Sequence, residues 1–184
     1  TSSAEIAFGL LFEEDNPQTK AVMLFVDSGG GDGVAGEEIA NALKAFEKPS
    51  VAVIREMGAS SAYWAATGAD KIFASKISSV GGIGVTSSYL DQSSKDAKEG
   101  YKYVELTSAK YKDLGNPSRP ITQEEKVIWI SDLEKMHDVV VQEIAKNRNL
   151  KVEEVDKIAN GLTFIGLDAL KYGLIDVANI QRGI

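Results

Sequence analysis

The chain has 184 residues, of which 43% are hydrophobic and 26% charged, and its formal net charge is −7. This is the composition of a globular protein with a sizeable core, and its acidic balance argues against nucleic acid as a partner, because binding phosphates needs clustered lysine and arginine. Cysteine is absent and His137 is the single histidine. Disulfides, thiolate metal sites, cysteine nucleophiles and sites that need two imidazoles are therefore excluded.

No stretch contains the roughly 18 consecutive apolar residues that span a bilayer, and no secretory signal is visible. The chain begins at Thr1 rather than methionine. We therefore expect a trimmed or processed form, from which a targeting or anchoring segment could have been removed. No internal repeat and no linker interrupts the sequence, so a single domain is expected over residues 1–184.

The first half alternates helical and strand patterns. The expected elements, in chain order, are a helix over 4–14, a strand over 21–26, a helix over 34–47, a strand over 50–54, a helix over 62–69 and a strand over 71–74. The continuous apolar run at 21–26 is typical of a strand buried on both faces of a parallel sheet. This order implies right-handed β-α-β crossovers and an α/β fold.

The second half is more polar at first and then helical. The expected elements are an extended glycine-punctuated segment over 78–85, a partly helical segment over 88–100, a strand over 101–106, an irregular stretch over 107–117, a long helix to about 147, short helices over 150–159 and 164–172, and a closing sheet edge over 173–176. Thr122 and Glu125 form a capping-box pattern before the long helix. Its apolar stripe contains Ile130, Leu133, Met136, Val140 and Ile144. His137 lies beside this stripe, as a half-buried helix residue rather than a catalyst.

The chain is organised around residues 57–66, where small residues follow an apolar run. The pattern predicts a strand, a tight turn and a helix, with a serine hydroxyl at the turn. A serine at a helix N-terminus lies near free N–H groups and a dipole that favour a developing negative charge. On this stretch alone, a simple N-cap role for Ser60 or Ser61 is favoured.

A glycine cluster follows the first predicted strand, at residues 27–33. Glycines at the carboxyl end of a buried strand let backbone N–H groups point into the crevice where α/β folds place ligands. Three consecutive glycines, Gly29 to Gly31, cost conformational order, which favours a functional loop over a flexible turn.

A serine nucleophile needs a base. His137 sits mid-helix and is followed directly by Asp138, which argues against a Ser-His-Asp triad, and no metal-ligand spacing or phosphate-loop motif is present. Lysine remains, provided that burial or nearby positive charge lowers its pKa from about 10.4 to roughly 7–8. Lys110 and Lys112 lie amid apolar and aromatic residues, although a solvated loop lysine paired with Asp113 stays the simpler interpretation for either one.

Five segments, taken in order, resemble the signal peptide peptidase A family, the Ser-Lys peptidases of the Clp/crotonase-like fold. Residues 27–31 resemble its N-S-P-G-G loop, and residues 59–64 resemble its A-S-G-G-Y-Y segment. Residues 81–85 resemble its G-S-I-G-V segment, and residues 111–113 with 116–119 resemble the surroundings of its catalytic lysine. Residues 166–176 resemble its closing G-x-x-A-x-x-x-G-L-I-D segment. Each match is weak by itself, but five in family order across nearly the whole chain are strong.

The resemblance implies a Clp/crotonase-like α/β fold, with stacked β-α-β units, a mainly parallel sheet and helices outside. It implies a serine endopeptidase that cleaves peptides such as remnant signal peptides. Ser60 is then the nucleophile and Lys112 the general base, with Lys110 as the fallback. The N–H groups of Gly30 and Ser61 are the expected oxyanion hole.

Extended substrate is expected to add as a strand along the glycine-rich edge. The expected substrate-binding residues are Gly29, Gly31, Tyr63, Gly82 and Val85. Small or apolar substrate residues would fit a pocket near Val85 and Tyr63. The resemblance implies no metal and no cofactor, because a Ser-Lys dyad needs none.

The expected partners are a peptide or protein substrate and further copies of the chain in a homo-oligomer, without nucleic acid. In the full-length cellular protein, the resemblance implies membrane association on the extracytoplasmic side through a segment absent from this sequence. The present chain is expected to be soluble.

The sequence departs from the family pattern in several places. Gly29 replaces a proline, and Ser61 with the residue after it replaces two glycines. Gly82 stands where the family has a serine thought to orient the lysine, so that Ser78, Ser79 or a water would have to substitute. The strand that usually opens the domain is absent.

Three alternatives stay open. A phage-type protease for capsid or scaffold maturation would use the same dyad. An inactive homologue that binds peptides or serves in assembly would account for the changes at Gly29 and Gly82. An acyl-CoA enzyme of the crotonase type shares the fold, but it needs a pantetheine tunnel and acidic catalysts that the sequence does not place.

Overall fold

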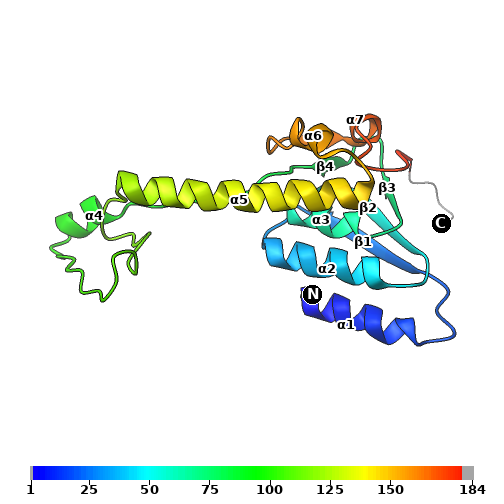
Figure 1. Cartoon of the computed structure of the whole chain (residues 1–184), viewed down its shortest axis with the longest axis horizontal. Helices are drawn as coiled ribbons and strands as arrows, with labels where there is room; N and C mark the ends of the chain where they lie inside the picture. Colours follow the sequence, from blue (N-terminus) through cyan, green and yellow to red (C-terminus); the bar gives the residue numbers. More distant parts are fainter. Residues whose placement is uncertain (1, 180–184) are drawn as a thin grey trace. The chain divides into compact units, whose positions relative to one another are not determined.

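A computed structural model describes residues 2–179 of the protein (Figure 1). The chain divides into two compact units. Unit 1 comprises Thr1–Gly84 and Val139–Ile184, and unit 2 comprises Val85–Asp138. The long helix α5 (Gln123–Arg148) contributes its first part to unit 2 and its last part to unit 1. The expectation of a single domain stays a prediction.

Unit 1 is an α/β structure. Its other elements are α1 (Ser3–Glu14), β1 (Val22–Ser28), α2 (Gly33–Ala45), β2 (Ser50–Ala59), α3 (Ser61–Thr67), β3 (Lys71–Ala74), β4 (Ser79–Gly81), α6 (Val152–Asp156), β5 (Thr163–Ile165) and α7 (Gly166–Lys171). The sheet has the order β1-β2-β4-β5, and β3 also pairs with β2. All pairings of β2 are parallel, and β4 with β5 is antiparallel. The expected α/β class with a mainly parallel sheet is confirmed.

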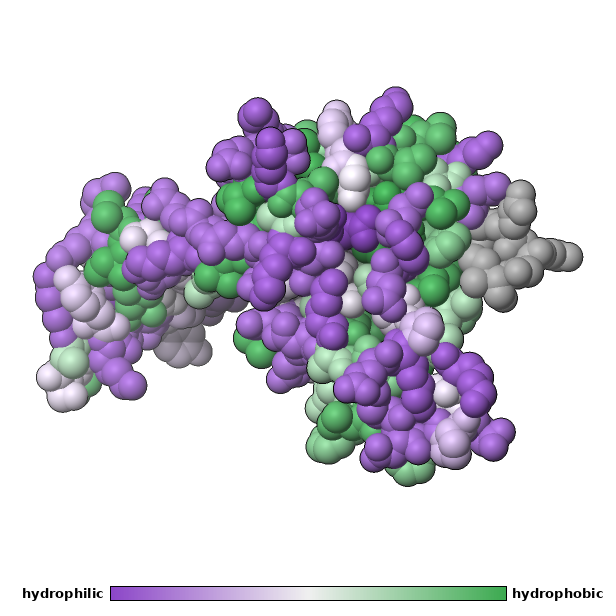
Figure 2. Space-filling view, turned by 45° about the vertical axis from the view of Figure 1, so that its right-hand side comes forward, coloured by the Kyte–Doolittle hydropathy of each residue, from purple (hydrophilic) through white to green (hydrophobic). Residues whose placement is uncertain are grey.

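Strand β1 is not buried on both faces, so that expectation was wrong. Within residues 2–179 it pairs with β2 alone, which makes it an edge strand. Val26 packs into the core, whereas Phe25 is 64% exposed. Apolar residues reach the molecular surface in several places (Figure 2). A continuous apolar run cannot distinguish a central strand from an edge strand that has one open face.

Strand β2 is central and longer than its apolar run. Ala52 and Ile54 are fully buried, and the strand continues to Ala59 because residues 57–59 pair with β4. The apolar pattern stops at Arg55, where the register with β1 also shifts: Val26 is opposite Ile54, but Ser28 is opposite Gly58. Such an irregularity re-aims the end of a strand, here at the serine turn.

Two expected elements differ in the structure. Residues 101–106 are exposed and form no strand, because alternation makes a strand only where a partner strand is available. Residues 163–165 form β5 rather than the start of a helix, since they pair with β4. The expected closing edge is confirmed: the N–H of Asp176 donates to Ile72 O at 2.9 Å, and Val177 bridges to Phe73.

The apolar stripe of α5 is buried only toward its carboxyl end. Ile144 lies in the core of unit 1 and Val140 packs against it, whereas Ile130 and Met136 are each 54% exposed. His137 is half-buried, as expected. Within residues 2–179, no helix is long and apolar enough to cross a membrane.

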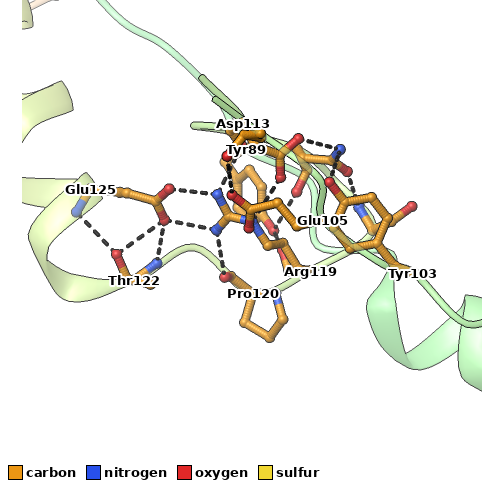
Figure 3. Close-up of polar contacts among 11 residues, drawn as sticks. Tyr89, Tyr103, Glu105, Asp113, Arg119, Pro120, Thr122 and Glu125 are labelled. Atoms are coloured by element: carbon orange, nitrogen blue, oxygen red, sulfur yellow. Dashed lines mark hydrogen bonds and ion pairs between the residues drawn. The ribbon is translucent and has the colours of Figure 1, made fainter. Parts of the chain in front are cut away.

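Unit 2 contains α4 (Ser93–Lys98) and is held by a charged network around Arg119 (Figure 3). The guanidinium donates to Asp113 Oδ2 at 3.0 Å and to the two carboxylate oxygens of Glu125 at 2.6 and 2.9 Å. Glu125 also accepts the N–H of Thr122 at 2.9 Å, and Thr122 Oγ1 accepts the N–H of Glu125 at 3.2 Å. The expected capping box is confirmed, and its glutamate is the buried partner of Arg119.

This network predicts an acid-sensitive unit 2. The Arg119 hydrogen bond lowers the pKa of Glu125 to about 2 from its ordinary 4.5. Protonation therefore favours the unfolded chain: the stability from this carboxylate is present above about pH 4.5 and lost as the pH falls toward about 2. We expect Glu125→Gln to flatten the decline of melting temperature over this range, measured by circular dichroism.

Glu124→Gln is the matched control. Glu124 also pairs with a cation, Lys110, but its side chain is 55% exposed and solvent screens the pair. Its pH dependence should follow that of the wild type. Equal slopes for Glu125→Gln and the wild type would contradict the assignment of acid sensitivity to the Arg119 network.

Candidate active site

Ser60 occupies the tight turn between β2 and α3 in an unusual backbone conformation. Its φ is 54° and its ψ is −131°, a combination that costs a residue with a side chain roughly 1–3 kcal/mol. It stands at the N-cap position, but its hydroxyl makes no capping hydrogen bond and none to any other described residue. The simple N-cap interpretation is therefore wrong for this hydroxyl, which is left available for another partner.

The glycine loop after β1 lies directly against the serine turn. A Cβ placed on Gly30 would lie 2.7 Å from both Ala59 O and Ser60 Cβ, and 3.0 Å from Ser61 N. Gly30 also has a φ of +96°, so only glycine fits both the contact and the conformation. The structure thus brings Gly30, Ser60 and Ser61 together.

The two candidate oxyanion donors, the N–H groups of Gly30 and Ser61, differ in their hydrogen bonding in the structure. The N–H of Gly30 donates to Ser28 Oγ at 3.2 Å, an exposed contact that a ligand oxygen could replace. Ser61 is the first residue of α3, so its N–H has no acceptor within the helix. Both groups border a cleft of about 390 Å³ between α1, α2 and the end of β1.

A second glycine pair borders Ser60 from β4. The N–H of Ser60 donates to Gly81 O at 2.8 Å. A Cβ on Gly82 would lie 3.3 Å from Ser60 N and from Ala59 Cβ, and the φ of Gly82 is +60°. The expected substrate residue Gly82 therefore lies beside the serine, on a loop that approaches it closely.

The remaining expected substrate residues are dispersed. Gly29 and Gly31 are exposed in the loop next to Gly30. Tyr63 is fully buried, and its hydroxyl donates to Leu174 O at 2.7 Å; burial raises the pKa of this phenol well above its usual value. Tyr63 therefore packs the core and lines no surface pocket. Val85 is the first residue of unit 2.

The two candidate lysines differ in their partners within unit 2. Lys110 Nζ lies 2.6 Å from Glu124 Oε1 and packs over the Tyr111 ring at 4.9 Å. The Glu124 hydrogen bond raises the pKa of Lys110 to about 12, which keeps its amine charged. Lys112 pairs with no carboxylate in the described part of the chain. Ser60 and Lys112 belong to different units, and their pairing stays a prediction.

The described residues contain no group of three or more histidine, cysteine, aspartate or glutamate side chains that could hold a metal ion. One residue near Ser60 gave no signal in the sequence. Thr163 in β5 lies against Gly82, which only the antiparallel pairing of β5 with β4 could show.

Residues 42–182 match the family model described as peptidase family S49. The chain belongs to peptidase family S49. The serine turn, the Gly81–Gly82 pair and Lys112 lie inside the matched range, and the Gly30 loop lies before it. The family expected from the sequence motifs is confirmed.

Several curated relatives of this S49 chain carry protease names. A Methanocaldococcus jannaschii protein, provisionally named protease MJ0651, is 36% identical over 171 residues, which are 92% of this chain and 55% of that protein. The chloroplastic serine protease SPPA of Arabidopsis thaliana is 28% identical over 92% of this chain and 26% of its own length. Protease 4 of Haemophilus influenzae is 30% identical over 88% of this chain and 27% of its own. The chain spans between about a quarter and about half of these relatives.

Among solved structures, a point mutant of ClpP1 from Listeria monocytogenes is similar to this S49 chain with a TM-score of 0.65. The match covers 98% of this chain and 85% of that one, at 16% sequence identity. The expected Clp-like fold is confirmed.

Proposed function

We propose that this chain is the catalytic part of a serine endopeptidase in which Ser60 is the nucleophile and Lys112 the general base. The observation that carries the proposal is the hydrogen bonding and backbone conformation of Ser60, in a chain that belongs to peptidase family S49. Its hydroxyl forms no cap although it occupies a helix N-cap, and its backbone is strained. Strained residues of this kind cluster at active sites.

The proposed reaction needs no cofactor. The neutral amine of Lys112 takes the Ser60 Oγ proton as Oγ forms a bond to the peptide carbonyl carbon. The carbonyl oxygen becomes an oxyanion, which accepts hydrogen bonds from the N–H groups of Gly30 and Ser61. The C–N bond then breaks, the ammonium returns its proton to the leaving nitrogen, and water hydrolyses the acyl-enzyme.

Lys112 is preferred over Lys110 as the base for an electrostatic reason. A base must be neutral when it accepts the proton. The carboxylate of Glu124 holds the Lys110 amine in its charged form, whereas Lys112 has no such partner among residues 2–179.

The substrate is proposed to be an extended peptide, such as a remnant signal peptide, that lies along the glycine-rich segments beside Ser60; β4 itself is already paired on both sides, with β2 and β5. The cleft beside Gly30 and Ser61 would take a small or apolar side chain. Its walls include the apolar side chains of Ile6, Leu24 and Ile39. This cleft replaces the expected pocket beside Tyr63.

A homo-oligomer is proposed on the strength of exposed apolar helix faces, such as Phe8, Leu11 and Phe12 of α1. Membrane association on the extracytoplasmic side, through a segment outside this sequence, stays a proposal that rests on the family resemblance. The same dyad would serve a phage-type maturation protease, which genome context would distinguish.

Labelling with a fluorophosphonate, read by intact mass and peptide mapping, tests the proposed function. We expect one adduct, on Ser60, formed faster as the pH rises and the base loses its proton. No adduct on folded protein would contradict the peptidase and favour an inactive peptide-binding or assembly module.

Replacement of Gly30 tests the oxyanion hole. In Gly30→Ala the new methyl group would lie 2.7 Å from Ala59 O, which is backbone and cannot yield easily, so the loop must shift with its N–H. Loss of one oxyanion donor lowers kcat by about 10² to 10³. Steady-state cleavage of a fluorogenic peptide would measure this loss.

Gly31→Ala is the matched control for backbone strain. Gly31 also has positive φ, +153°, but a Cβ there would meet nothing within 4 Å. Its kcat should fall far less than that of Gly30→Ala, while thermal melts report any loss of folding in either variant. Similar kcat values for the two variants would argue against Gly30 as an oxyanion donor.

A further inference from the structure

Lys112 lies in a short segment of unit 2 that has no regular structure of its own. Residues 109–116, here called the base segment, belong to no helix or strand. Their hydrogen bonds to one another are local, such as the N–H of Lys112 to Ala109 O at 3.0 Å, and the Lys112 side chain is exposed. Exposed turns open easily when nothing else holds them. Contacts from neighbouring residues therefore decide how well the position of Lys112 is defined.

Arg119 holds the residue directly after Lys112 at two atoms. Its Nε donates to Asp113 Oδ2 at 3.0 Å, and its Nη2 donates to the main-chain oxygen of Asp113 at 2.8 Å. The second contact acts on the backbone itself and not only on a side chain. Because a guanidinium is planar and its donors are fixed relative to one another, the two bonds together set the course of the chain next to Lys112.

The same guanidinium is bound by Glu125 (Figure 3). Glu125 lies in the first turn of α5, so Arg119 joins the base segment to the start of a helix. The exposed fractions of the three side chains are 19% for Arg119, 15% for Asp113 and 6% for Glu125. Solvent and salt therefore screen these contacts little, and bonds between charged groups of this geometry are strong and directional.

The carboxylate of Asp113 is fully engaged by this arrangement. Its second oxygen, Oδ1, accepts a hydrogen bond from Asn116 Nδ2 at 2.9 Å. Hydrogen bonds from Tyr103 and Asn116, together with Arg119, lower the pKa of Asp113, so the group stays charged at neutral pH. Asp113 follows Lys112 in the sequence, but both of its oxygens are bound to other residues of unit 2.

A second ion pair between the base segment and α5 is exposed. Lys110 Nζ lies 2.6 Å from Glu124 Oε1, with exposed fractions of 66% and 55% for the two side chains. Exposed pairs contribute little and are screened by solvent. The contacts of Arg119 are therefore the ones that anchor the base segment to α5.

We propose that Arg119 is the positioning residue of the general base: by holding Asp113 it fixes the main chain from which Lys112 extends. The lysine then meets Ser60 from an ordered segment, and less entropy is lost when the reacting groups come together. Arg119 itself neither gains nor loses a proton. The inference rests on the proposed Ser60–Lys112 dyad and adds to it the residue that orders the base.

Arg119→Lys tests this role. Lysine keeps the positive charge, but its ammonium cannot bind Asp113 and Glu125 with the fixed geometry of a guanidinium. We expect kcat for a fluorogenic peptide to fall by roughly 10- to 100-fold, the effect of a misplaced reacting group, with KM unchanged. Glu124→Gln, which removes only the exposed pair with Lys110, is the matched control and should keep the wild-type kcat. Thermal melts should show both variants folded.

A Lys112→Arg background separates positioning of the base from a general loss of structure. Without the base, fluorophosphonate labels Ser60 only slowly. If Arg119 acts through Lys112, adding Arg119→Lys should leave this slow rate unchanged, since effects on one coupled unit are not additive. A further loss in the double variant would overturn the inference, as would a wild-type kcat in Arg119→Lys alone.

Asp113→Asn serves if Arg119→Lys fails to fold. Asparagine keeps the size of the side chain and the main-chain oxygen that Arg119 Nη2 binds, but it removes the charge at the contact with Nε. We expect kcat of the folded variant to fall by about tenfold, and this loss too should vanish in the Lys112→Arg background. A folded Asp113→Asn with the wild-type kcat would contradict the inference.

These outcomes are distinguishable from failure of the proposed function. If Ser60→Ala and Lys112→Arg are inactive but Arg119→Lys is fully active, the dyad stands and the positioning role falls. If Lys112→Arg keeps the wild-type kcat and labelling rate, the assignment of the base is itself wrong, and the role of Arg119 falls with it.

Discussion

Replacing Ser60 by alanine is expected to abolish peptide cleavage while leaving the fold intact. Without the Ser60 hydroxyl no acyl-enzyme can form, and direct attack by water on the peptide is much slower. We therefore expect kcat/KM to fall by about 10³-fold or more. The fold should persist because the Ser60 hydroxyl makes no hydrogen bond within residues 2–179, and alanine keeps a Cβ at the same φ of 54°. Activity assays, fluorophosphonate labelling and thermal melts together measure this.

Ser61→Ala identifies the correct serine of the pair. Its proposed contribution is a main-chain N–H, which alanine retains, so its activity should stay within about tenfold of wild type. Strong loss in Ser61→Ala together with an active Ser60→Ala would reverse the assignment of the nucleophile.

Ser60→Gly extends the same prediction to stability. Glycine adopts positive φ without the roughly 1–3 kcal/mol that a side chain costs there, and this gain is offset by about 1 kcal/mol of unfolded-chain entropy. The glycine variant should therefore melt at or above the wild-type temperature and be inactive. A strongly destabilised Ser60→Gly would show that the conformation of Ser60 is not strained.

Replacing Lys112 by arginine is expected to give the second large loss. Arginine keeps the positive charge and the length of the side chain, but it stays protonated in proteins and cannot accept a proton. Loss of general-base catalysis lowers rates by about 10² to 10⁴. We expect kcat and the fluorophosphonate labelling rate to fall together, because both depend on activation of Ser60.

Lys110→Arg is the matched control two residues away. An arginine there can keep the ion pair with Glu124, and because that pair is exposed its loss would in any case matter little. Near-wild-type activity is expected. An inactive Lys110→Arg beside an active Lys112→Arg would make Lys110 the base and would mean that its pair with Glu124 breaks on substrate binding.

The motifs around Ser60 were readable because each is local. Strand, turn and helix signals follow one another within residues 50–67, and the structure has β2, Ser60 and α3 in that order. The capping box of Thr122 and Glu125 was readable for the same reason. The ion pair of Glu125 with Arg119 was not, because a capping pattern does not indicate which residue packs against the glutamate.

Predictions failed where a neighbour in space decided the outcome. The apolar run of β1 was expected to be covered on both faces, but one face is open and Phe25 is 64% exposed. The start of the last predicted helix became β5 because β4 lies beside it. Tyr63 was expected beside a substrate pocket, whereas its ring is buried in the core and its hydroxyl donates to Leu174 O.

The sequence by itself determined the order of the elements from α1 to β3 and the family, and the family motifs named the candidate residues Ser60, Gly30 and Lys112, since these depend on local patterns and motif order. Only the tertiary structure decided that the Ser60 hydroxyl forms no cap, that Gly30 and Gly82 lie against Ser60, and that Thr163 lies against Gly82. The physical reason is that the approaches of Gly30, Gly82 and Thr163 join residues 20 or more positions apart, which periodicity and turn chemistry do not encode.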